Sequence, residues 1–351
     1  MDLVRSLAAE MSAALRRGAV RRMTVPRREV VEDPTGRKYV SMPAVSPDYD
    51  LFINKTATIV PDSVGGRDTT VTSVVSVFAA GSGRVLRVMD GAVVTNLKCA
   101  AVTALVTDRC AAPAGGVLGI IGAGVQARLQ YRAVSAVRDL EEVRIYSRTA
   151  DRAAAFGRHV AQAAGDGTRV VVCGSAADAS RGVDILATAT TSAAPLPISP
   201  DLSDHVHVNC MGAHTVGSRE LDADLLRSSV LIVEDRATAV AEAGDLHRTA
   251  IELDALESPA AAGLDRRRTV FSSTGCASLD LITCAHLGQV PAAAERELDV
   301  LTRRLDLDVP ADLAGGVLHG YRALREMTTL LRQAGPSAGG AGGAGTEAPD
   351  A

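Results

Sequence analysis

The 351-residue chain contains no tryptophan, and aromatic residues make up only 3% of it. Proteins that bind single-stranded nucleic acid stack bases on aromatic side chains, so such a platform would be hard to assemble here. The chain also lacks an excess of charge, with 37 basic and 41 acidic residues and a net charge of -4. Nothing in this balance attracts nucleic acid or an anionic membrane surface. We therefore expect a small-molecule partner, with no nucleic acid and no membrane.

Long apolar stretches are absent as well. No run of about 18 apolar residues occurs, so a membrane-spanning helix is not expected. Charged residues interrupt the first 17 positions, which argues against a signal peptide. An amphipathic helix that Gly18 ends is expected there instead, because four apolar residues recur at intervals of four. These are Leu3, Leu7, Met11 and Leu15. We expect a cytoplasmic protein.

Metal-binding patterns are missing too. The six cysteines form no CxxC pair and show no zinc spacing with histidine, so we interpret them as buried thiols. His205 and His207 alternate along an expected strand, but no third ligand accompanies them. We therefore expect no metal.

From residue 117 onward, short apolar runs alternate with segments rich in Ala, Arg and Leu. This pattern is typical of a parallel sheet covered by helices on both faces. We expect six strands, at residues 117–122, 141–147, 168–173, 183–190, 205–212 and 230–235. The predicted fold class is α/β, a doubly wound Rossmann sheet over residues 116–285.

The rest of the chain reads differently. Residues 1–115 contain β-rich pieces and one continuous helical segment at 95–111, which together predict a mixed α+β domain. Residues 335–351 are rich in glycine and poor in apolar bulk, so they cannot offset the entropy cost of ordering. We expect a disordered tail.

A glycine motif, GAGVQA, follows the first Rossmann strand and opens a helix. In this context Gly122 permits a tight turn, Gly124 lets a diphosphate approach the backbone, and Ala127 allows the helix to pack closely on the strand. Val125 and Gln126 complete the candidate cofactor loop. The alternative is a merely structural turn.

The second Rossmann strand ends in Ser147, Arg148 and Thr149, where NAD-binding proteins usually carry an acidic residue. Arg148 is suited to pair with the 2′-phosphate of NADP, and Ser147 or Thr149 to donate a hydrogen bond to it. A solvated arginine at a helix start is the competing interpretation. The cofactor is expected to be NAD or NADP, with a slight preference for NADP.

Lysine is scarce. Lys38, Lys55 and Lys98 are the three lysines among 37 basic residues, so arginine is the usual cation of this chain. An ammonium can polarise a carbonyl or a carboxylate in ways a guanidinium cannot. Chance use on the surface remains open, above all for Lys38.

Several segments resemble the ornithine cyclodeaminase/mu-crystallin family, which includes ketimine reductases and amino-acid dehydrogenases. The resemblance covers roughly residues 25–290. It is carried by INKTATIVPDS, MDGAVVTNLKCAAVTALVTD, GIIGAGVQAR, VRIYSRT, NCMGAHTVGSREL and VFSSTGCASLDL. It implies a homodimer in which residues 1–115, completed by 286–334, form a substrate-binding and dimerisation domain.

The resemblance also implies roles for single residues. Arg27 would pair with a substrate carboxylate, for which its neighbour Arg28 competes. Lys55 would be the polarising or acid/base cation, and Thr70 would lie between the substrate and the nicotinamide. Asp280 falls where members of the family place cofactor-side contacts, or it caps a helix.

Two departures from the family pattern affect the expected reaction. Lys98 stands in LKCAA where the family has an arginine in LRTAA, so a cation remains for substrate binding but the bidentate fork is lost. His214 stands where cyclodeaminases carry an aspartate. A histidine can accept a proton but repels an ammonium when it is itself charged. We therefore expect plain hydride transfer to or from an amino acid or its imine, with Lys55 or His214 handling the proton.

Two other functions stay open. One is cyclodeamination of ornithine or lysine, which releases ammonia without net change in NADH. The other is a non-catalytic, nicotinamide-dependent binding protein, which the substitutions at Lys98 and His214 would permit. Lys55, Arg27 and the glycine loop argue against that second alternative.

Overall fold

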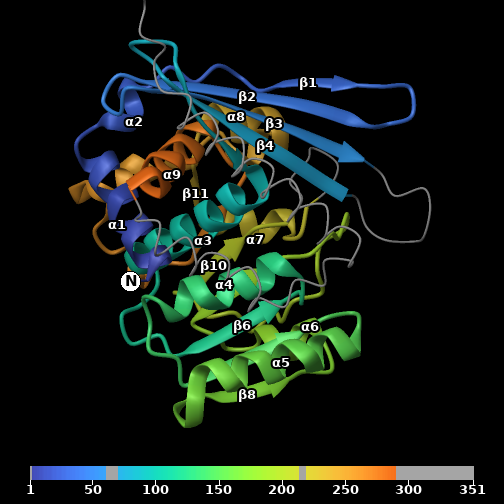
Figure 1. Cartoon of the computed structure of the whole chain (residues 1–351). Coiled ribbons are helices and arrows are strands. Elements are labelled where there is room, and N and C mark those ends of the chain that lie inside the picture. Colours follow the sequence, from blue (N-terminus) through green and yellow to red (C-terminus); the bar gives the residue numbers. More distant parts are fainter. Residues whose placement is uncertain (1, 61–69, 213–218, 290–351) are drawn as a thin grey trace, which may run out of the picture. The chain divides into compact units, whose positions relative to one another are not determined.

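The computed structural model describes residues 2–60, 70–212 and 219–289, and two separate sheets organise them (Figure 1). The first is an antiparallel sheet in the order β1-β2-β3-β4-β5. Its strands are β1 (Glu29–Glu32), β2 (Lys38–Ser46), β3 (Leu51–Val60), β4 (Thr70–Ala79) and β5 (Val85–Asp90). The second is parallel throughout, in the order β12-β11-β13-β10-β9-β6-β7-β8.

The strands of the parallel sheet are short. They are β6 (Val117–Ile121), β7 (Glu142–Tyr146), β8 (Arg169–Val172), β9 (Ile185–Thr188), β10 (His207–Cys210), β11 (Val230–Val233), β12 (Ile251–Glu252) and β13 (Thr269–Ser272). The helices are α1 (Leu3–Arg16), α2 (Ala19–Arg22), α3 (Gly91–Cys110), α4 (Val125–Ser135), α5 (Ala150–Ala164), α6 (Ala176–Ser180), α7 (Ala223–Arg227), α8 (Arg236–Ala243) and α9 (Ala277–Gln289).

Helices cover both faces of the parallel sheet. Ile185 and Ala187 of β9 face a core shared with α4 and α5, while Leu186 between them faces a second core built with α6, α7 and α8. This alternation explains why the strands read as continuous apolar runs, because neither side of the strand meets water. The predicted Rossmann fold is confirmed.

The six predicted strands are all present, but the sheet has two more. β13 lies between β10 and β11, and β12 pairs with β11 at one edge. β12 contains only two residues, too few to stand out as an apolar run. β13 overlaps the segment VFSSTGCASLDL, for which the sequence pattern predicts no strand. Its insertion places the loop that follows it beside the ends of β10 and β11.

Among the described residues, helices cover one face of the antiparallel sheet. α3 and α9 pack on its inner face, where Met42, Ile53 and Val75 are buried. Lys55 occupies this inner face as well, directly opposite Met42 in the β2–β3 register. The outer face exposes a set of large apolar side chains. They are Val31, Tyr39, Val74, Val85 and Val88, with exposed fractions between 41% and 65%.

Helix α3 packs on both sheets and is buried along most of its length. The Asp90 carboxylate caps its first turn, accepting hydrogen bonds from the backbone N–H groups of Ala92 and Val93 at 2.7 and 3.1 Å. Gly91 lets this end approach β4, because a Cβ there would lie 2.2 Å from the Ser73 Oγ. At the other end, the Arg138 guanidinium donates to carbonyls of the last turn. Both ends of α3 are therefore anchored, which fixes the position of its side chains between the sheets.

The ends of the predicted domains fall partly outside the described residues. α9 contacts α1, α3, β2 and β3, so this helix packs with the first sheet. Residues 290–334 and the predicted tail at 335–351 lie outside the part of the chain that the structure describes. None of the described helices is long and apolar enough to cross a membrane.

Candidate active site

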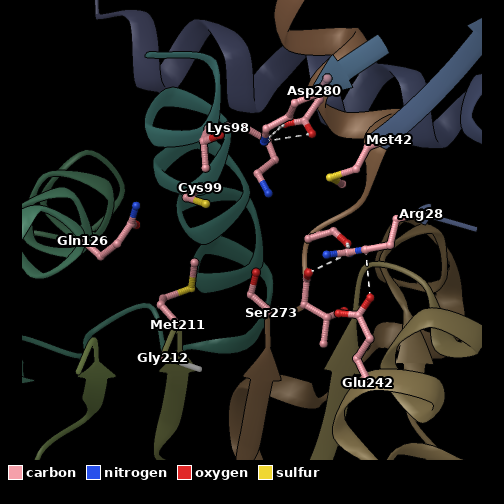
Figure 2. Close-up of a pocket in the computed structure, with 14 residues that line it drawn as sticks. Arg28, Met42, Lys98, Cys99, Gln126, Met211, Gly212, Glu242, Ser273 and Asp280 are labelled. Carbon is pink, nitrogen blue, oxygen red and sulfur yellow. Dashed lines mark hydrogen bonds and ion pairs between the residues drawn. The ribbon is translucent and has the colours of Figure 1, made fainter. Parts of the chain in front are cut away.

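A cavity of about 350 Å³ lies where the inner face of the antiparallel sheet, α3 and the carboxyl ends of the parallel strands meet (Figure 2). Its lining is rich in cations, acids and sulfur. The lining residues are Arg28, Met42, Lys55, Thr95, Lys98, Cys99, Gln126, Met211, Gly212, Glu242, Ser273, Thr274, Gly275 and Asp280. Parallel α/β sheets bind ligands at this edge, outside the carboxyl ends of their strands.

Lys55 and Asp280 form a buried ion pair in this cavity. The Lys55 Nζ lies 3.3 and 3.4 Å from the two carboxylate oxygens of Asp280. Asp280 belongs to the first turn of α9 and is fully buried, and the Lys55 side chain is 9% exposed. Of the two interpretations offered for Asp280, cofactor contact or helix cap, neither describes this contact. The pair fixes one ammonium against the cavity with little freedom to move.

Lys98 reaches the same cavity from α3. The residue is 4% exposed, yet its Nζ has no hydrogen-bond or ion-pair partner among the described residues. Gly275, at a φ of +74°, makes room for it, since a Cβ there would lie 3.1 Å from the Lys98 Nζ. A buried charge without a partner is costly, so this ammonium is suited to receive an anionic group from a ligand.

The charge state of Lys98 follows from its neighbours. Burial acts to lower the pKa of Lys98, but electrostatic interaction with Cys99, Asp280 and Glu234 raises it above its usual value. Burial raises the pKa of the Cys99 thiol, so the two carboxylates are the negative charges present at neutral pH. Lys98 is therefore a cation in the cavity, and Cys99 is a protonated thiol and a poor nucleophile.

Of the two adjacent arginines, Arg28 and not Arg27 lines the cavity. The Arg28 Nη2 donates to the carbonyls of Thr274 and Gly275 at 3.0 and 2.8 Å, and its Nε lies 2.8 Å from the Glu242 Oε1. The side chain of Arg27 is exposed and is not part of the lining. The sequence interpretation preferred Arg27, whereas the structure places its competitor at the site.

The loop between β13 and α9 is held from two sides. Glu234, which follows β11, accepts hydrogen bonds from the Ser273 hydroxyl at 2.5 Å and from the backbone N–H groups of Thr274 and Gly275 at 3.1 Å each. Arg28 binds the carbonyls of the same loop from the other side. Because the backbone N–H groups and the carbonyls of Thr274 and Gly275 are all occupied, the loop is a rigid wall of the cavity.

The two glycines of the motif differ in what they require. Gly122 has a φ of +126°, and a Cβ there would lie 2.3 Å from the Ala189 carbonyl oxygen, so the fold itself demands glycine. Gly124 has no atom within 4 Å of an added Cβ. Packing does not explain Gly124, whereas close approach of a diphosphate to the N-terminus of α4 does.

The rest of the loop agrees with a dinucleotide cradle. Val125 begins α4, and the fully buried Ala127 packs against the sheet. Gln126 lines the cavity on the side opposite Arg28 and Glu242 (Figure 2), and its Nε2 donates to the Asn96 Oδ1 at 3.0 Å. Gln126 therefore connects the predicted cofactor loop with the cavity.

Ser147, Arg148 and Thr149 follow β7, the strand next to β6. The Gly122 backbone N–H donates to the Tyr146 carbonyl at 2.8 Å, so the two predicted cofactor segments adjoin each other. Arg148 and Thr149 are exposed, and the Thr149 backbone N–H donates to the Ser147 hydroxyl at 3.4 Å. Thr149 precedes the first residue of α5, and its hydroxyl makes no cap hydrogen bond.

Two predicted residues lie wholly or partly outside the described part of the chain. His214 lies outside the described residues. Thr70 begins β4, where its backbone pairs with that of Val60, and its side chain is likewise outside the part described. Their predicted roles remain predictions.

A sequence profile of the ornithine cyclodeaminase/mu-crystallin family matches residues 2–287. The chain belongs to this family.

Curated relatives and a solved structure agree with this membership. The chain is 35% identical over 265 residues to the ketimine reductase mu-crystallin of Mus musculus, covering 73% of this chain and 82% of that protein. It is 30% identical over 260 residues to a Delta(1)-pyrroline-2-carboxylate reductase of Bacillus cereus, covering 70% and 79%. The Delta(1)-pyrroline-2-carboxylate reductase of Thermococcus litoralis, solved with NADH and L-proline, superimposes with a TM-score of 0.72 at 25% identity, covering 81% and 92%.

These comparisons confirm three predictions from the sequence: the family, an enzyme acting on amino acids or their imines, and a nicotinamide cofactor. Sequence reasoning missed Glu234 and Glu242. Both are acids in short segments after β11, without a motif around them, and only the fold brings them to Arg28 and its loop.

Proposed function

We propose that this enzyme is an NAD(P)H-dependent reductase of imino carboxylates. The observation that carries the proposal is Lys98, a buried ammonium without a protein partner among the described residues, in a cavity that also holds the Lys55–Asp280 pair. A substrate carboxylate supplies the missing anion for Lys98, and an imine nitrogen is the group that a neighbouring ammonium protonates.

Lys98 and Arg28 bind the substrate carboxylate in this proposal. Both line the cavity, and the Arg28 Nη1 has no partner among the described residues. A guanidinium N–H and an ammonium give two charge-assisted hydrogen bonds to one carboxylate. The shared anion orients the substrate so that its C=N bond is held at a fixed place in the cavity.

Lys55 moves the proton. When bound, reduced nicotinamide supplies the hydride that the imine carbon receives. The Lys55 Nζ holds a proton for the imine nitrogen, which becomes an amine as its carbon is reduced. Asp280 is the counter-ion of the Lys55 ammonium and holds it in position through the ion pair at 3.3 Å.

The cofactor loop contributes backbone donors. Gly122, Gly124 and Val125, with the N-terminus of α4, would hold the diphosphate, and Gly124 leaves open the space that such a group requires. Ser147, Arg148 and Thr149 would hold the adenine ribose. The exposed Arg148 after β7 supports a preference for NADP, because a guanidinium pairs well with a 2′-phosphate.

Reduction suits the described acids better than cyclodeamination does. A diamino substrate brings a distal ammonium that needs a carboxylate of its own. The carboxylates of the described lining, Glu242 and Asp280, are already paired with Arg28 and Lys55. The Lys55–Asp280 ion pair, which places an acid/base group in the cavity, also argues against the non-catalytic binding protein.

The test is a rate measurement with purified protein, NADH or NADPH, and Delta(1)-pyrroline-2-carboxylate or Delta(1)-piperideine-2-carboxylate. We expect oxidation of the cofactor that depends on the imine, and a faster rate with NADPH. Cofactor binding without oxidation on any imine would contradict the proposal and favour a binding protein.

We further propose a homodimer joined through the outer face of the antiparallel sheet. Exposed apolar side chains gathered on one face are typical of an interface. Replacing Val74 and Val88 by lysine should convert the dimer to a monomer in sedimentation velocity. A monomeric wild-type protein would contradict this arrangement.

We also propose a cytoplasmic location, with residues 1–115 and 286–334 as the substrate-binding domain.

A further inference from the structure

Glu242 is a cavity residue to which the proposed reaction gives no part. It lies on α8, and its Oε1 is 2.8 Å from the Arg28 Nε, with 31% of the Glu242 side chain and 23% of the Arg28 side chain exposed. Figure 2 shows the two side chains facing each other at one side of the cavity. A carboxylate at the site of an anionic substrate would repel that substrate, so its presence needs a physical reason.

The donors of Arg28 supply that reason. A guanidinium carries five N–H groups, one on Nε and two on each Nη. The Glu242 carboxylate lies beside the Nε as its counter-ion, and the carbonyls of Thr274 and Gly275 accept hydrogen bonds from the Nη2. Nη1 is the one nitrogen of this side chain left without a partner among the described residues. The protein contacts therefore orient the guanidinium and leave one nitrogen for a ligand.

The backbone around Arg28 does not fix the side chain by itself. Residues 25–28 lie between an isolated bridge at Thr24 and the first residue of β1, outside any helix or strand. A free arginine side chain loses rotamer entropy when it binds a ligand. The two carbonyls and Glu242 remove much of this freedom before the substrate arrives, which strengthens binding.

We propose that Glu242 is a positioning residue that holds the Arg28 guanidinium so that Nη1 receives the substrate carboxylate. This inference rests on the proposed function, in which Arg28 binds that carboxylate. It is opposed to a second arrangement, in which Glu242 competes with the substrate for Arg28. The two arrangements predict shifts of opposite sign when Glu242 is removed.

The experiment measures substrate binding apart from turnover in Glu242→Ala and Glu242→Gln. Calorimetry gives the Kd of pyrrole-2-carboxylate, a stable planar carboxylate, in the presence of NADP+, and steady-state rates give KM and kcat for Delta(1)-piperideine-2-carboxylate. We expect E242A to raise both Kd and KM about tenfold, with kcat and the cofactor Kd within threefold of wild type. E242Q should fall in between, because its amide oxygen keeps a partial negative charge beside the Arg28 Nε while the full charge of the carboxylate is lost.

A double-mutant cycle tests whether Glu242 acts through Arg28. In an Arg28→Ala background, E242A should change the Kd of pyrrole-2-carboxylate by less than twofold, because the group it positions is gone. Glu257→Gln is the matched control. Glu257 pairs with Arg16 and Arg109 outside the cavity, so its loss should lower the unfolding temperature and leave Kd and KM unchanged.

Several results would overturn the inference. Tighter binding in E242A would show competition, and an unchanged Kd would leave the pair a structural contact. An equal tenfold effect in the Arg28→Ala background would place Glu242 in direct contact with the ligand. Failure of the proposed function is distinguishable, because a wild type that binds pyrrole-2-carboxylate but never oxidises NADPH would overturn the reductase alone.

Discussion

Buried polar groups around the two sheets differ in whether they have partners within the protein. Around the parallel sheet, buried acids and histidines have hydrogen-bond partners within the protein. Glu220, for example, accepts from Thr188, Thr190 and the backbone N–H of Gly212. Around the inner face of the antiparallel sheet, Lys55 has one partner and Lys98 none among the described residues. The first region thus builds a scaffold for loops, and the second keeps cations available for a ligand.

Charge therefore has a different use in each region. Satisfied polar groups rigidify a structure, and an unsatisfied one marks a place where another molecule completes the contacts. Mutations in the antiparallel region should affect turnover, and mutations of buried polar groups in the parallel region should affect stability.

Lys55→Ala carries the largest expected effect. Turnover should fall a hundredfold or more, the scale of a lost acid/base group, while the cofactor Kd stays near that of wild type. Lys38→Ala is the matched control, since Lys38 lies on the same sheet but is exposed beside Glu32. The measurement is the turnover rate of each variant at saturating cofactor. Equal rates in both variants would remove Lys55 from the site.

His207 provides the opposite case, a buried polar group that affects stability. Burial lowers the pKa of His207 from 6.5 to about 3, and its ring bonds to the Thr269 hydroxyl and to Asn209. Because the folded state binds the proton more weakly, its contribution to stability is complete above pH 6.5 and is lost as pH falls toward 3. From pH 7 to pH 5 the wild type should lose about 2 kcal/mol through this group.

Urea unfolding at both pH values checks this expectation. His207→Gln should be less stable than wild type at pH 7, and the difference between the two should shrink at pH 5. A constant difference would mean that the pKa of His207 is the same in the folded and the unfolded state.

Gly124→Ala and Gly122→Ala separate binding from folding within the cofactor loop. The Cβ at position 124 meets no protein atom, so Gly124→Ala should keep its unfolding temperature and bind NADPH at least tenfold more weakly, about 1.4 kcal/mol. Gly122→Ala should lower the unfolding temperature, because its Cβ would lie 2.3 Å from the Ala189 carbonyl oxygen. Normal NADPH binding by Gly124→Ala would argue for a purely structural turn.

Arg148→Asp should have the smallest effect. The side chain is exposed, so stability should not change, and the ratio of kcat/KM for NADPH to that for NADH should fall several-fold toward NADH. Arg152→Asp, an exposed position on α5, is the control and should leave the ratio unchanged. The same ratio in both variants would count against a phosphate contact.

The sequence predicted the parallel region better than the antiparallel one. Strands buried on both faces usually appear as apolar runs, and six are predicted in this way. The two-residue β12 offers no run, and β13, with the sequence TVFS, has a polar residue at each end. The scarcity of lysine draws attention to Lys38, Lys55 and Lys98, and the family resemblance then distinguishes Lys55 and Lys98. Their placement in one cavity with Asp280 depends on α3 and α9 packing on one sheet face, which no local pattern contains.

The choice between Arg27 and Arg28 shows the same limit. Adjacent residues outside regular structure have no periodicity to say which side chain turns inward. Only the contacts with Glu242 and the loop at residues 273–275 distinguish them. Glu234 was missed for a related reason, since its partners lie in the loop after β13, a strand that the sequence pattern does not predict.

One measurement tests the central claim most directly. NADPH absorbance and ammonia are followed together while the purified enzyme acts on a panel of cyclic imino carboxylates and on ornithine and lysine. The account predicts one NADPH oxidised for each imine reduced, and no ammonia from the diamino acids. Ammonia released from ornithine or lysine with no net change in cofactor would contradict it and establish a cyclodeaminase.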